Sequence, residues 1–479
     1  MNMFAMAARR LTKHPLSVLA ALSVTCLVLA CSGGGGDGSS SSGNSGGEAA
    51  SAPTPPASGA TATPAAGASA SATLQVPDAL ASPPFDTKRS LQVPPGFGIR
   101  VWARVGGARF MALAPNGDVL VSVPSEGKIV LLRERAGDTP QVSDFATGLH
   151  NPHDMVFHAI AGQTYLYVAE SNRISRSVYR SGDTQRADSE VVVDGLPDDS
   201  TPELRGRYGH ELKNIALGPD DKLYVSIAST CNACTEDTTS DPVRGAIYQY
   251  TADGKQGRLF ARGIRNAEGL DFIPGTNALW MTVNGRDEIR VPQDIDVDGD
   301  GSSDLGKLIA SYVDEHPAEI FSVVRDGGNY GWPFCDQEQN ASMSNLDATA
   351  DFEFNRNGAN LDCGGITRAS KGIRPHAAPL GFSFLHDSNV PAAYRKGAAV
   401  ALHGCWNCTS LRAGYKVVFF PFDDAGNAGA EIDLVTGFVT DPDARALWGR
   451  PVDVIADGRG NLLISDDFAG AVYQLFPSP

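Results

Sequence analysis

The chain of 479 residues carries 55 acidic and 39 basic side chains, which gives a formal net charge of −16. Nucleic-acid binding needs a basic face toward the phosphates, so this charge argues against a nucleic-acid partner. The length exceeds that of one simple hydrophobic core, so we expect either two domains or one large radial repeat.

Residues 1–30 have the features of an export signal. Basic residues stand at the start, and the run 16–29 is apolar apart from Ser and Thr. That run is shorter than the roughly 20 residues of a membrane span, and it ends at Ala30-Cys31, the pattern of a lipobox cysteine. We therefore expect an exported protein that is lipid-anchored through Cys31, facing the periplasm or the cell exterior. A secretory signal followed by an incidental cysteine is the alternative.

Residues 32–73 are almost entirely Gly, Ser, Ala, Pro and Thr. Such a composition cannot bury enough apolar surface to offset the entropy lost on ordering. We predict a disordered tether over residues 31–73, including the lipidated Cys31, and a folded domain over residues 74–479.

One pattern recurs through the predicted domain: an apolar segment, a turn rich in Pro, Asn, Asp and Gly, and a second β-branched segment. The six copies are residues 110–123, 153–169, 213–226, 269–282, 380–402 and 451–465. Third strands follow at 128–132, 246–250 and 471–475. Six short sheets bury their faces by packing radially, so we predict an all-β fold, a six-bladed β-propeller. A two-sheet sandwich is the alternative, and it would not explain six similar units.

Polar residues stand at equivalent places in these repeats, next to the predicted inner strands. They are His153, His210, Arg265, Asn266, Asn284, His376 and Arg450. Each alone is more typical of a turn or cap than of a catalyst. Repeat equivalence places them at one mouth of the central channel, where His, Arg and Asn together suit an anionic cofactor and an acid–base group.

The segment 294–304 alternates Asp with Gly and small residues. Short carboxylates in such a loop suit a calcium ion, and we predict ligands at Asp296, Asp298, Asp300 and Asp304. Position twelve from Asp296 is Lys307 rather than Glu, so the segment is no regular EF-hand. A solvated acidic loop is the alternative.

Six cysteines fall in the predicted domain: Cys231, Cys234, Cys335, Cys363, Cys405 and Cys408. An even number in an exported domain favours disulfides. The simplest of the 15 possible connectivities pairs neighbours along the chain: Cys231–Cys234, Cys335–Cys363 and Cys405–Cys408. A zinc site and a redox-active Cys-x-x-Cys are the alternatives, but no further ligands and no thioredoxin-like βαβ pattern accompany these cysteines.

Several short motifs, in this order, resemble one family. They are Gly209-His210, Gly263-Ile-Arg-Asn266 with Glu268-Gly-Leu270, Asn329-Tyr-Gly-Trp-Pro333, Pro375-His-Ala-Ala-Pro-Leu380, His403-Gly-Cys-Trp-Asn407 and Gly449-Arg-Pro-Val452. The family is that of the pyrroloquinoline-quinone (PQQ)-dependent sorbosone/aldose dehydrogenases, relatives of soluble quinoprotein glucose dehydrogenase. The resemblance spans residues 91–475.

The resemblance implies a role for each matching residue. His210 matches the general base that takes the substrate hydroxyl proton, and Arg265 with Asn266 matches the pair that binds the quinone. The remaining implied contacts are Asn284 and Arg450 to the cofactor, and the backbone carbonyls of Gly285 and Arg286 to a calcium ion that clamps it. We expect His153 and His376 at the cofactor as well.

The chain also departs from the soluble glucose dehydrogenases. Val452 stands where they place a second arginine, His403, Cys405 and Trp406 occupy the region of their fifth-blade lysine, and His376 replaces a smaller hydroxyl residue. Glucose itself is therefore not implied.

The resemblance implies a PQQ- and calcium-dependent oxidation of a sugar, polyol or aldose hydroxyl, with electrons passed to a cytochrome or quinone. A calcium-dependent lactonase-type hydrolase and a non-catalytic ligand-binding propeller are the alternatives, because fold alone does not decide function.

Overall fold

The computed structural model describes residues 69–135, 139–386 and 388–478. The predicted signal, Cys31 and most of the predicted tether lie outside the described residues. In the described part helix is confined to α1 (Ala310–Val313) and short 3-10 turns at Asp78–Leu80, Pro124–Glu126, Thr235–Thr239, Arg356–Gly358, Cys363–Gly365 and Ala392–Tyr394. No helix of this part is long and apolar enough to span a membrane.

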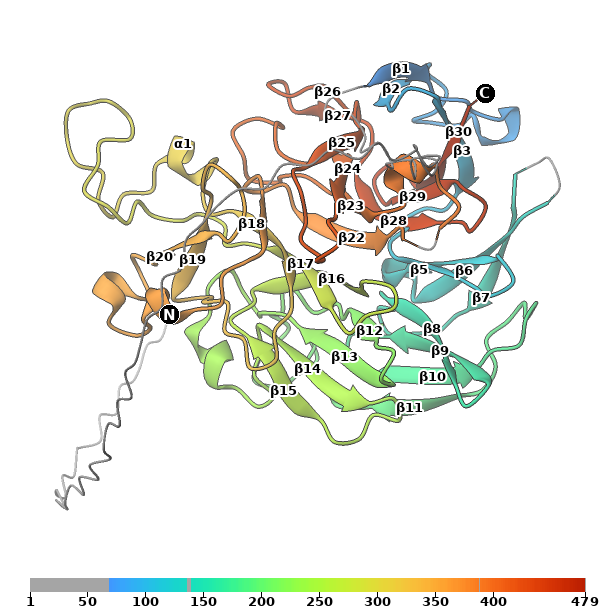
Figure 1. The fold of residues 1–479 in the computed structure, drawn as a ribbon, viewed down its shortest axis with the longest axis horizontal. Coiled ribbons are helices and arrows are strands. Elements are labelled where there is room, and N and C mark those ends of the chain that lie inside the picture. Colours follow the sequence, from blue (N-terminus) through green and yellow to red (C-terminus); the bar gives the residue numbers. More distant parts are fainter. Residues whose placement is uncertain (1–68, 136–138, 387, 479) are drawn as a thin grey trace, which may run out of the picture. The chain divides into compact units, whose positions relative to one another are not determined.

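Six four-stranded antiparallel sheets form the blades of a propeller (Figure 1). Blade 1 contains β4 (Met111–Leu113), β5 (Val119–Val123), β6 (Lys128–Arg133) and β7 (Gln141–Ala146). Blade 2 contains β8 (Met155–Ile160), β9 (Gln163–Ala169), β10 (Ile174–Val178) and β11 (Ser189–Val193). Blade 3 contains β12 (Ile215–Leu217), β13 (Lys222–Ile227), β14 (Ala246–Thr251) and β15 (Arg258–Arg262).

The other three blades follow in chain order, and β16, β22 and β28 are their inner strands. Blade 4 contains β16 (Asn266–Phe272), β17 (Leu279–Asn284), β18 (Glu319–Val323) and β21 (Lys371–Ile373). Blade 5 contains β22 (Pro379–Phe384), β23 (Gly397–Leu402), β24 (Lys416–Pro421) and β25 (Ile432–Val435). Blade 6 contains β28 (Pro451–Ala456), β29 (Leu462–Asp466), β30 (Ala471–Pro477) and β3 (Phe97–Arg104). The predicted six-bladed propeller is confirmed.

The ring closes through its N-terminal strand. β3 pairs antiparallel with β30, with Ile99 opposite Leu475, so the outermost strand of blade 6 comes from the start of the domain. This closure leaves the last blade complete and ties both ends of the domain into one sheet.

The hairpin turns have the predicted chemistry. In blade 1 the Gly117 N–H donates to the Ala114 carbonyl at 2.8 Å, and Gly117 has a φ of 86°. Only glycine adopts that backbone conformation without strain. Such a turn explains why residues rich in Pro, Asn, Asp and Gly stand between the first and second strands of several blades.

Three aspartates on alternate inner strands join neighbouring blades around the axis. Asp154 accepts a hydrogen bond from the backbone N–H of blade 3, Asp271 from that of blade 5, and Asp453 from that of blade 1. The three side chains line a channel cavity of about 150 Å³. They fix the inner strands whose ends carry the polar residues described below.

Apolar side chains fill the spaces between blades. Between blades 4 and 5, Phe321 packs edge-on to Phe382 with 5.1 Å between ring centroids, and Trp280 packs against Phe422 at 4.9 Å. Burial of such rings is the main stabilising contribution of the radial packing.

Three smaller two-stranded sheets lie outside the blades: β1 (Ala70–Thr73) with β2 (Ser90–Val93), β19 (Cys335–Glu338) with β20 (Asp347–Ala350), and β26 (Val439–Asp441) with β27 (Ala446–Leu447). β1 falls inside the segment predicted as tether, so the folded part begins a few residues earlier than predicted. β1 is mostly exposed and is held by backbone pairing, which composition does not reveal.

Candidate functional site

A cavity of about 270 Å³ lies where the blades present their polar residues. This volume is near the lower end of small-molecule sites, which start at roughly 300 Å³. Six of the residues predicted from repeat position line it: His210, Arg265, Asn266, Asn284, His376 and Arg450. The structure brings them together because each stands next to an inner strand or at the end of β17.

His210 has one ring nitrogen fixed and the other available. Its Nδ1 lies 2.9 Å from the Ser229 carbonyl oxygen, which can only accept, so Nδ1 carries the proton and Nε2 has the free lone pair. Burial, together with the nearby Arg265 charge, lowers the pKa of His210 to about 4. The imidazole is therefore neutral at physiological pH and able to accept a proton.

Arg265 is buried in the cavity wall and paired with Asp287 at 2.9 Å. Its Nε donates to the carbonyl oxygen of Asn232 at 3.2 Å. Burial alone would raise the pKa of Asp287, but hydrogen bonding from His376 and the charge of Arg265 lower it. This carboxylate is thus ionised and fixes the arginine.

Next to Arg265, Asn266 donates its Nδ2 to Glu268 at 2.9 Å. The second Glu268 oxygen, Oε2, is buried without a hydrogen-bond partner and lies 3.9 Å from Arg109. The Arg109 guanidinium also pairs with Asp467 at 3.0 Å, and Asp467 accepts from His403 Nε2 at 2.9 Å. Burial lowers the pKa of His403 to about 4, so this ring is a neutral donor.

Arg450 forms no carboxylate pair with any described residue. Its Nε and one terminal nitrogen donate to the carbonyls of His403 and Gly404, at 3.0 and 2.9 Å. The guanidinium also lies over the ring of Tyr415. Because carbonyls leave its charge uncompensated, Arg450 suits an anionic group in the cavity.

Asn284, Gly285 and Glu319 also line the cavity. Asn284 Oδ1 is buried without a hydrogen-bond partner. Glu319 accepts from the Gly285 N–H, and burial raises the pKa of Glu319 to about 7. An unpartnered amide oxygen is an available ligand for a hard cation.

His376 stands at a φ of 60° and donates Nε2–H to the Val313 carbonyl at 2.5 Å. Its Nδ1 lies 3.5 Å from Asp287. Burial alone would lower the pKa of His376, but this carboxylate raises it. The Asp287 carboxylate thus favours the protonated form of His376 in the cavity wall.

Two predicted residues are placed differently. His153 is fully buried and does not line the cavity, since Arg109 covers it with a contact of 3.3 Å between nitrogens. The structure thus places His153 against Arg109 rather than at the cavity, and the expected cofactor contact of His153 stays a prediction. The Arg286 side chain turns away from the cavity toward Asp351 and Glu353. The role of its backbone carbonyl stays a prediction.

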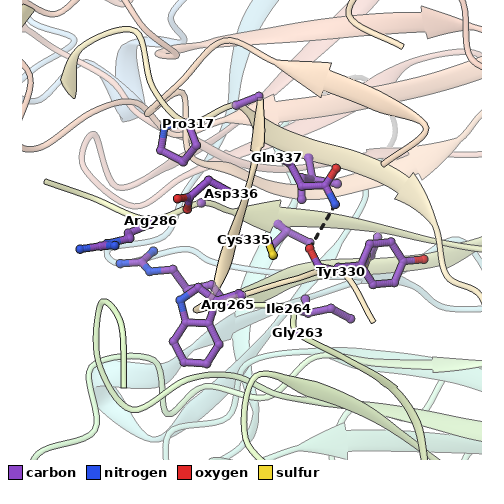
Figure 2. A pocket seen from close by; sticks show the side chains of 15 residues that line it. Gly263, Ile264, Arg265, Arg286, Pro317, Tyr330, Cys335, Asp336 and Gln337 are labelled. Carbon is purple, nitrogen blue, oxygen red and sulfur yellow. Dashed lines mark hydrogen bonds between the residues drawn. The ribbon is translucent and has the colours of Figure 1, made fainter. Parts of the chain in front are cut away.

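A second, smaller cavity of about 30 Å³ is lined in part by Arg265 and Arg286 (Figure 2). Figure 2 shows Arg265 and Arg286 extending in the same direction, with Asp336 near Arg286. Burial raises the pKa of Asp336 to about 7. This space corresponds to about one water molecule, so it is too small for a sugar or a quinone.

The segment 294–304 forms a loop in which the carboxylates of Asp296, Asp298 and Asp304 lie within 4.8 Å of one another. Asp300 is not in this group, and its Oδ1 accepts from the Ser302 N–H and hydroxyl at 2.7 and 2.6 Å. The structure thus gathers three of the four predicted ligands.

The predicted disulfides are confirmed. They are Cys231–Cys234, Cys335–Cys363 and Cys405–Cys408. The third closes a small loop at the cavity, which contains Trp406, 67% exposed. The first closes a loop whose Asn232 contacts Arg265 and Asp287.

Sequence reasoning missed Arg109, Asp287, Glu319 and Asp467 as parts of this site. Asp287 could have been predicted as part of the site, because it follows the predicted site residue Asn284 by only three positions. Glu319 begins an apolar strand and comes to the cavity through the pairing of β18 with β17, which no local pattern showed.

A family model described as TrAA12-like matches residues 91–477, a range that covers all six blades. This chain belongs to the TrAA12-like family. A curated relative, an uncharacterized protein of Borreliella burgdorferi, is 25% identical over 292 residues. That match spans 59% of this TrAA12-like chain and 62% of the relative, so less than two thirds of the relative's length.

Three solved structures share the fold of this TrAA12-like chain. The holo form of the pyranose dehydrogenase PQQ domain of Coprinopsis cinerea is 18% identical, with a TM-score of 0.66, covering 85% of this chain and 99% of that one. A calcium structure of the Trichoderma reesei family AA12 enzyme is 17% identical, with a TM-score of 0.65, and 81% and 96% of the two chains are covered. The PQQ-bound aldose sugar dehydrogenase of Streptomyces coelicolor is 16% identical, with a TM-score of 0.50 and coverage of 80% and 99%.

Proposed function

We propose that this TrAA12-like protein is a PQQ-dependent oxidoreductase that oxidises a hydroxyl group of a sugar, polyol or aldose. The observation that carries the proposal is the neutral His210, whose Nε2 has a free lone pair in a cavity lined by three arginines. The printed names of two structural neighbours, a pyranose dehydrogenase PQQ domain and a PQQ-bound aldose sugar dehydrogenase, support it.

In this proposal His210 accepts the proton of the substrate hydroxyl at Nε2, while Nδ1–H keeps its bond to Ser229. Arg265 and Asn266 donate toward negative charge that develops in the cavity, and Asp287 keeps Arg265 in place. Donors fixed before the reaction stabilise such charge at little reorganisation cost. PQQ, when bound, supplies the hydride acceptor.

The residues present fit an anionic quinone. Arg450 has no carboxylate partner among the described residues, so it would hold a carboxylate of the cofactor. Asn284 Oδ1, buried and unpartnered, together with the carbonyls of Gly285 and Arg286, would hold the calcium ion that clamps it. His376, whose pKa is raised by Asp287, would add positive charge when protonated. We further propose a structural calcium ion on Asp296, Asp298 and Asp304.

A hydrolase of lactonase type needs carboxylates free to hold a catalytic metal. In this cavity Asp287 is paired with Arg265, and Glu319 accepts from Gly285. Glu268 keeps one free oxygen, but Arg109 lies beside it. These contacts favour the oxidoreductase over the hydrolase.

We also propose that the protein is exported and held at a membrane through Cys31, with a cytochrome or a quinone as electron acceptor. The lipobox pattern at Ala30-Cys31 supports anchoring. Three disulfides support a compartment that is oxidising.

The test is a titration of the purified protein with PQQ in the presence of Ca²⁺, followed by absorbance and calorimetry. We expect one PQQ per chain and a roughly 10- to 100-fold weaker affinity in Arg265→Ala, since a hydrogen bond to a charged group contributes about 1.5–3 kcal/mol. Arg258→Ala is the matched control, because that arginine pairs with Asp326 at the exposed edge of blade 3. An affinity that is equal in Arg265→Ala and wild type, or no PQQ binding, would overturn the proposal.

A further inference from the structure

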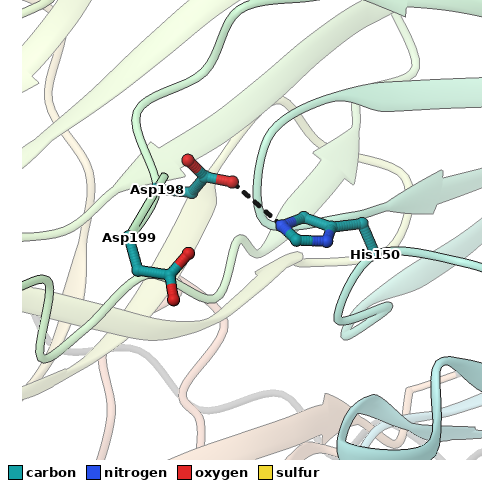
Figure 3. A group of neighbouring side chains, drawn as sticks. All are labelled: His150, Asp198 and Asp199. Atoms are coloured by element: carbon teal, nitrogen blue, oxygen red, sulfur yellow. Dashed lines mark hydrogen bonds and ion pairs between the residues drawn. The ribbon is translucent and has the colours of Figure 1, made fainter. Parts of the chain in front are cut away.

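His150, Asp198 and Asp199 form a compact group outside the cavity (Figure 3). One imidazole nitrogen and one carboxylate oxygen from each aspartate all lie within 4.8 Å of one another. Figure 3 shows the imidazole edge and the two carboxylates around a common space. His150 precedes β8 of blade 2, whereas the aspartates lie between β11 and β12, so two separate loops contribute.

We propose that this group is a binding site for a divalent transition metal ion such as Zn²⁺. Nitrogen and carboxylate oxygen are ligands that Zn²⁺ takes at about 2.0–2.2 Å, and ligands around one ion then lie roughly 3–4 Å apart. The 3.0 Å between His150 Nε2 and Asp198 Oδ2 is compatible with two such ligands. Three protein ligands leave one coordination position for water.

The ligand Asp198 is fixed before any metal binds. It is 1% exposed, and its Oδ1 accepts from the Ser200 N–H and hydroxyl at 3.0 and 2.6 Å, which leaves Oδ2 for the ion. Its backbone N–H donates to the Thr201 hydroxyl at 2.9 Å. Hydrogen bonds that orient a metal ligand in this way typically contribute about 10- to 100-fold in metal affinity.

The other two ligands are accessible. His150 has its side chain 45% exposed, and its backbone N–H donates to Glu170 at 2.7 Å. Asp199 is exposed, and its backbone N–H donates to Glu211 at 3.0 Å. An ion can therefore reach the group from solvent without moving the fold.

The same contacts connect the metal site to the loop of the proposed base. Glu211, next to His210, accepts from Asp199 and also from Asn151 Nδ2 at 2.8 Å. A metal ion on His150 and both aspartates would tie the loop before β8 to the loop that carries His210. The site is thus a structural one that restrains the edge of the functional cavity, and it does not depend on the cofactor.

The experiment measures Zn²⁺ binding by calorimetry, and Co²⁺ binding by its visible d–d absorption, on untagged and metal-stripped protein. We expect one ion per chain at micromolar free metal, with the melting temperature raised by the ion because it binds the folded state only. His150→Ala and the milder Asp199→Asn should each weaken binding by about tenfold or more.

His158→Ala is the matched control. His158 contacts the carboxylate of Asp221 at 2.7 Å, but the two belong to no group of three potential metal ligands among the described residues. This variant should bind the ion like wild type. Equal binding in wild type, His150→Ala and Asp199→Asn, or no binding in wild type, would contradict the proposal and leave His150–Asp198 as an ion pair only. Neither result depends on PQQ, so the outcome is separate from that of the proposed function.

Discussion

The guanidinium of Arg265 donates to the carboxylate of Asp287 at 2.9 Å, and two disulfide-closed loops hold Asp287 in turn. The Asp287 N–H donates to Asn232 Oδ1 at 2.8 Å, and Asn407 Nδ2 donates to the Asp287 carboxylate at 3.3 Å. Each asparagine lies between the two cysteines of a Cys-x-x-Cys disulfide. The orientation of Arg265 in the cavity therefore depends on covalently closed loops from blades 3 and 5.

Asp287→Ala should destabilise the fold because it leaves Arg265 buried without its partner. Breaking a buried pair in this way costs on the order of 3 kcal/mol, measured as the free energy of unfolding in denaturant. Asp326→Ala removes the partner of Arg258 in a pair whose side chains are 45% and 59% exposed, and it should cost at most about 1 kcal/mol. Equal losses in both variants would contradict the account of Asp287.

Replacing Cys405 and Cys408 by serine should reduce activity strongly while lowering the free energy of unfolding less than the loss of Cys335–Cys363 does. The loop that this disulfide closes is short, so its removal costs on the order of 2 kcal/mol, against about 4 kcal/mol for Cys335–Cys363, which are 28 positions apart. Only the first pair encloses Asn407, and its loss frees a partner of Asp287. Denaturant unfolding and turnover with PQQ give the two readouts, and a larger activity loss in the Cys335/Cys363 double serine variant would argue against this role.

The pH dependence of activity should reflect the low pKa of His210, which burial and Arg265 place at about 4. A histidine with a lowered pKa stabilises the fold above its ordinary pKa of 6.5, and this contribution is lost as the pH falls toward 4. We expect kcat/KM to stay level from neutral pH down to about pH 5 and to fall near pH 4. A fall centred near pH 6.5 in the wild-type protein would contradict this.

Ionisation of the Asp453 carboxyl group in the channel should lower the free energy of unfolding as the pH rises. Burial raises its pKa from 3.8 to about 7, so the folded state holds the proton more tightly than the unfolded state. The contribution is full below the unfolded pKa and is lost as the pH rises through about 7, on the order of 4 kcal/mol in total. Asp453→Asn cannot titrate, so the stability of wild type relative to this variant should decline between about pH 4.5 and 8. A constant difference would refute the assignment.

Chelation of calcium should lower the melting temperature of the wild-type protein through the loop at Asp296, Asp298 and Asp304. Asp296→Asn should melt at the lower temperature with or without chelator, because a ligand that binds only the folded state stabilises it. Asp300→Asn is the control, since Asp300 lies in the same loop but outside the group of three carboxylates. A chelator effect that persists in Asp296→Asn would place the stabilising calcium elsewhere.

The repeat pattern predicted the blades because turn chemistry and β-branched runs are local signals. The same reasoning predicted that His210, Arg265 and Arg450 would meet, since equivalent places in a radial repeat face one channel. The closing strand β3 was not predicted, because its partner β30 lies at the other end of the domain and only long-range pairing joins them.

The sequence could not predict which side chains cover one another at the site. His153 and His210 stand at similar places in neighbouring repeats, yet Arg109 from blade 1 covers the first and not the second. Asp287 and Glu319 gain their roles from contacts with Arg265 and Gly285 that depend on loop conformation. No spacing rule encodes such contacts.

The most direct test of the central claim is the reduction of bound PQQ by sugar, followed spectroscopically without oxygen in wild type and His210→Asn. A screen of pyranoses, aldoses and polyols should yield substrates that reduce the cofactor in wild-type protein. With the same cofactor loading, His210→Asn should reduce it roughly 10²–10⁴ times more slowly, as expected for loss of a general base. Equal rates in both proteins, or a loaded wild type that no sugar or polyol reduces, would contradict the proposed function.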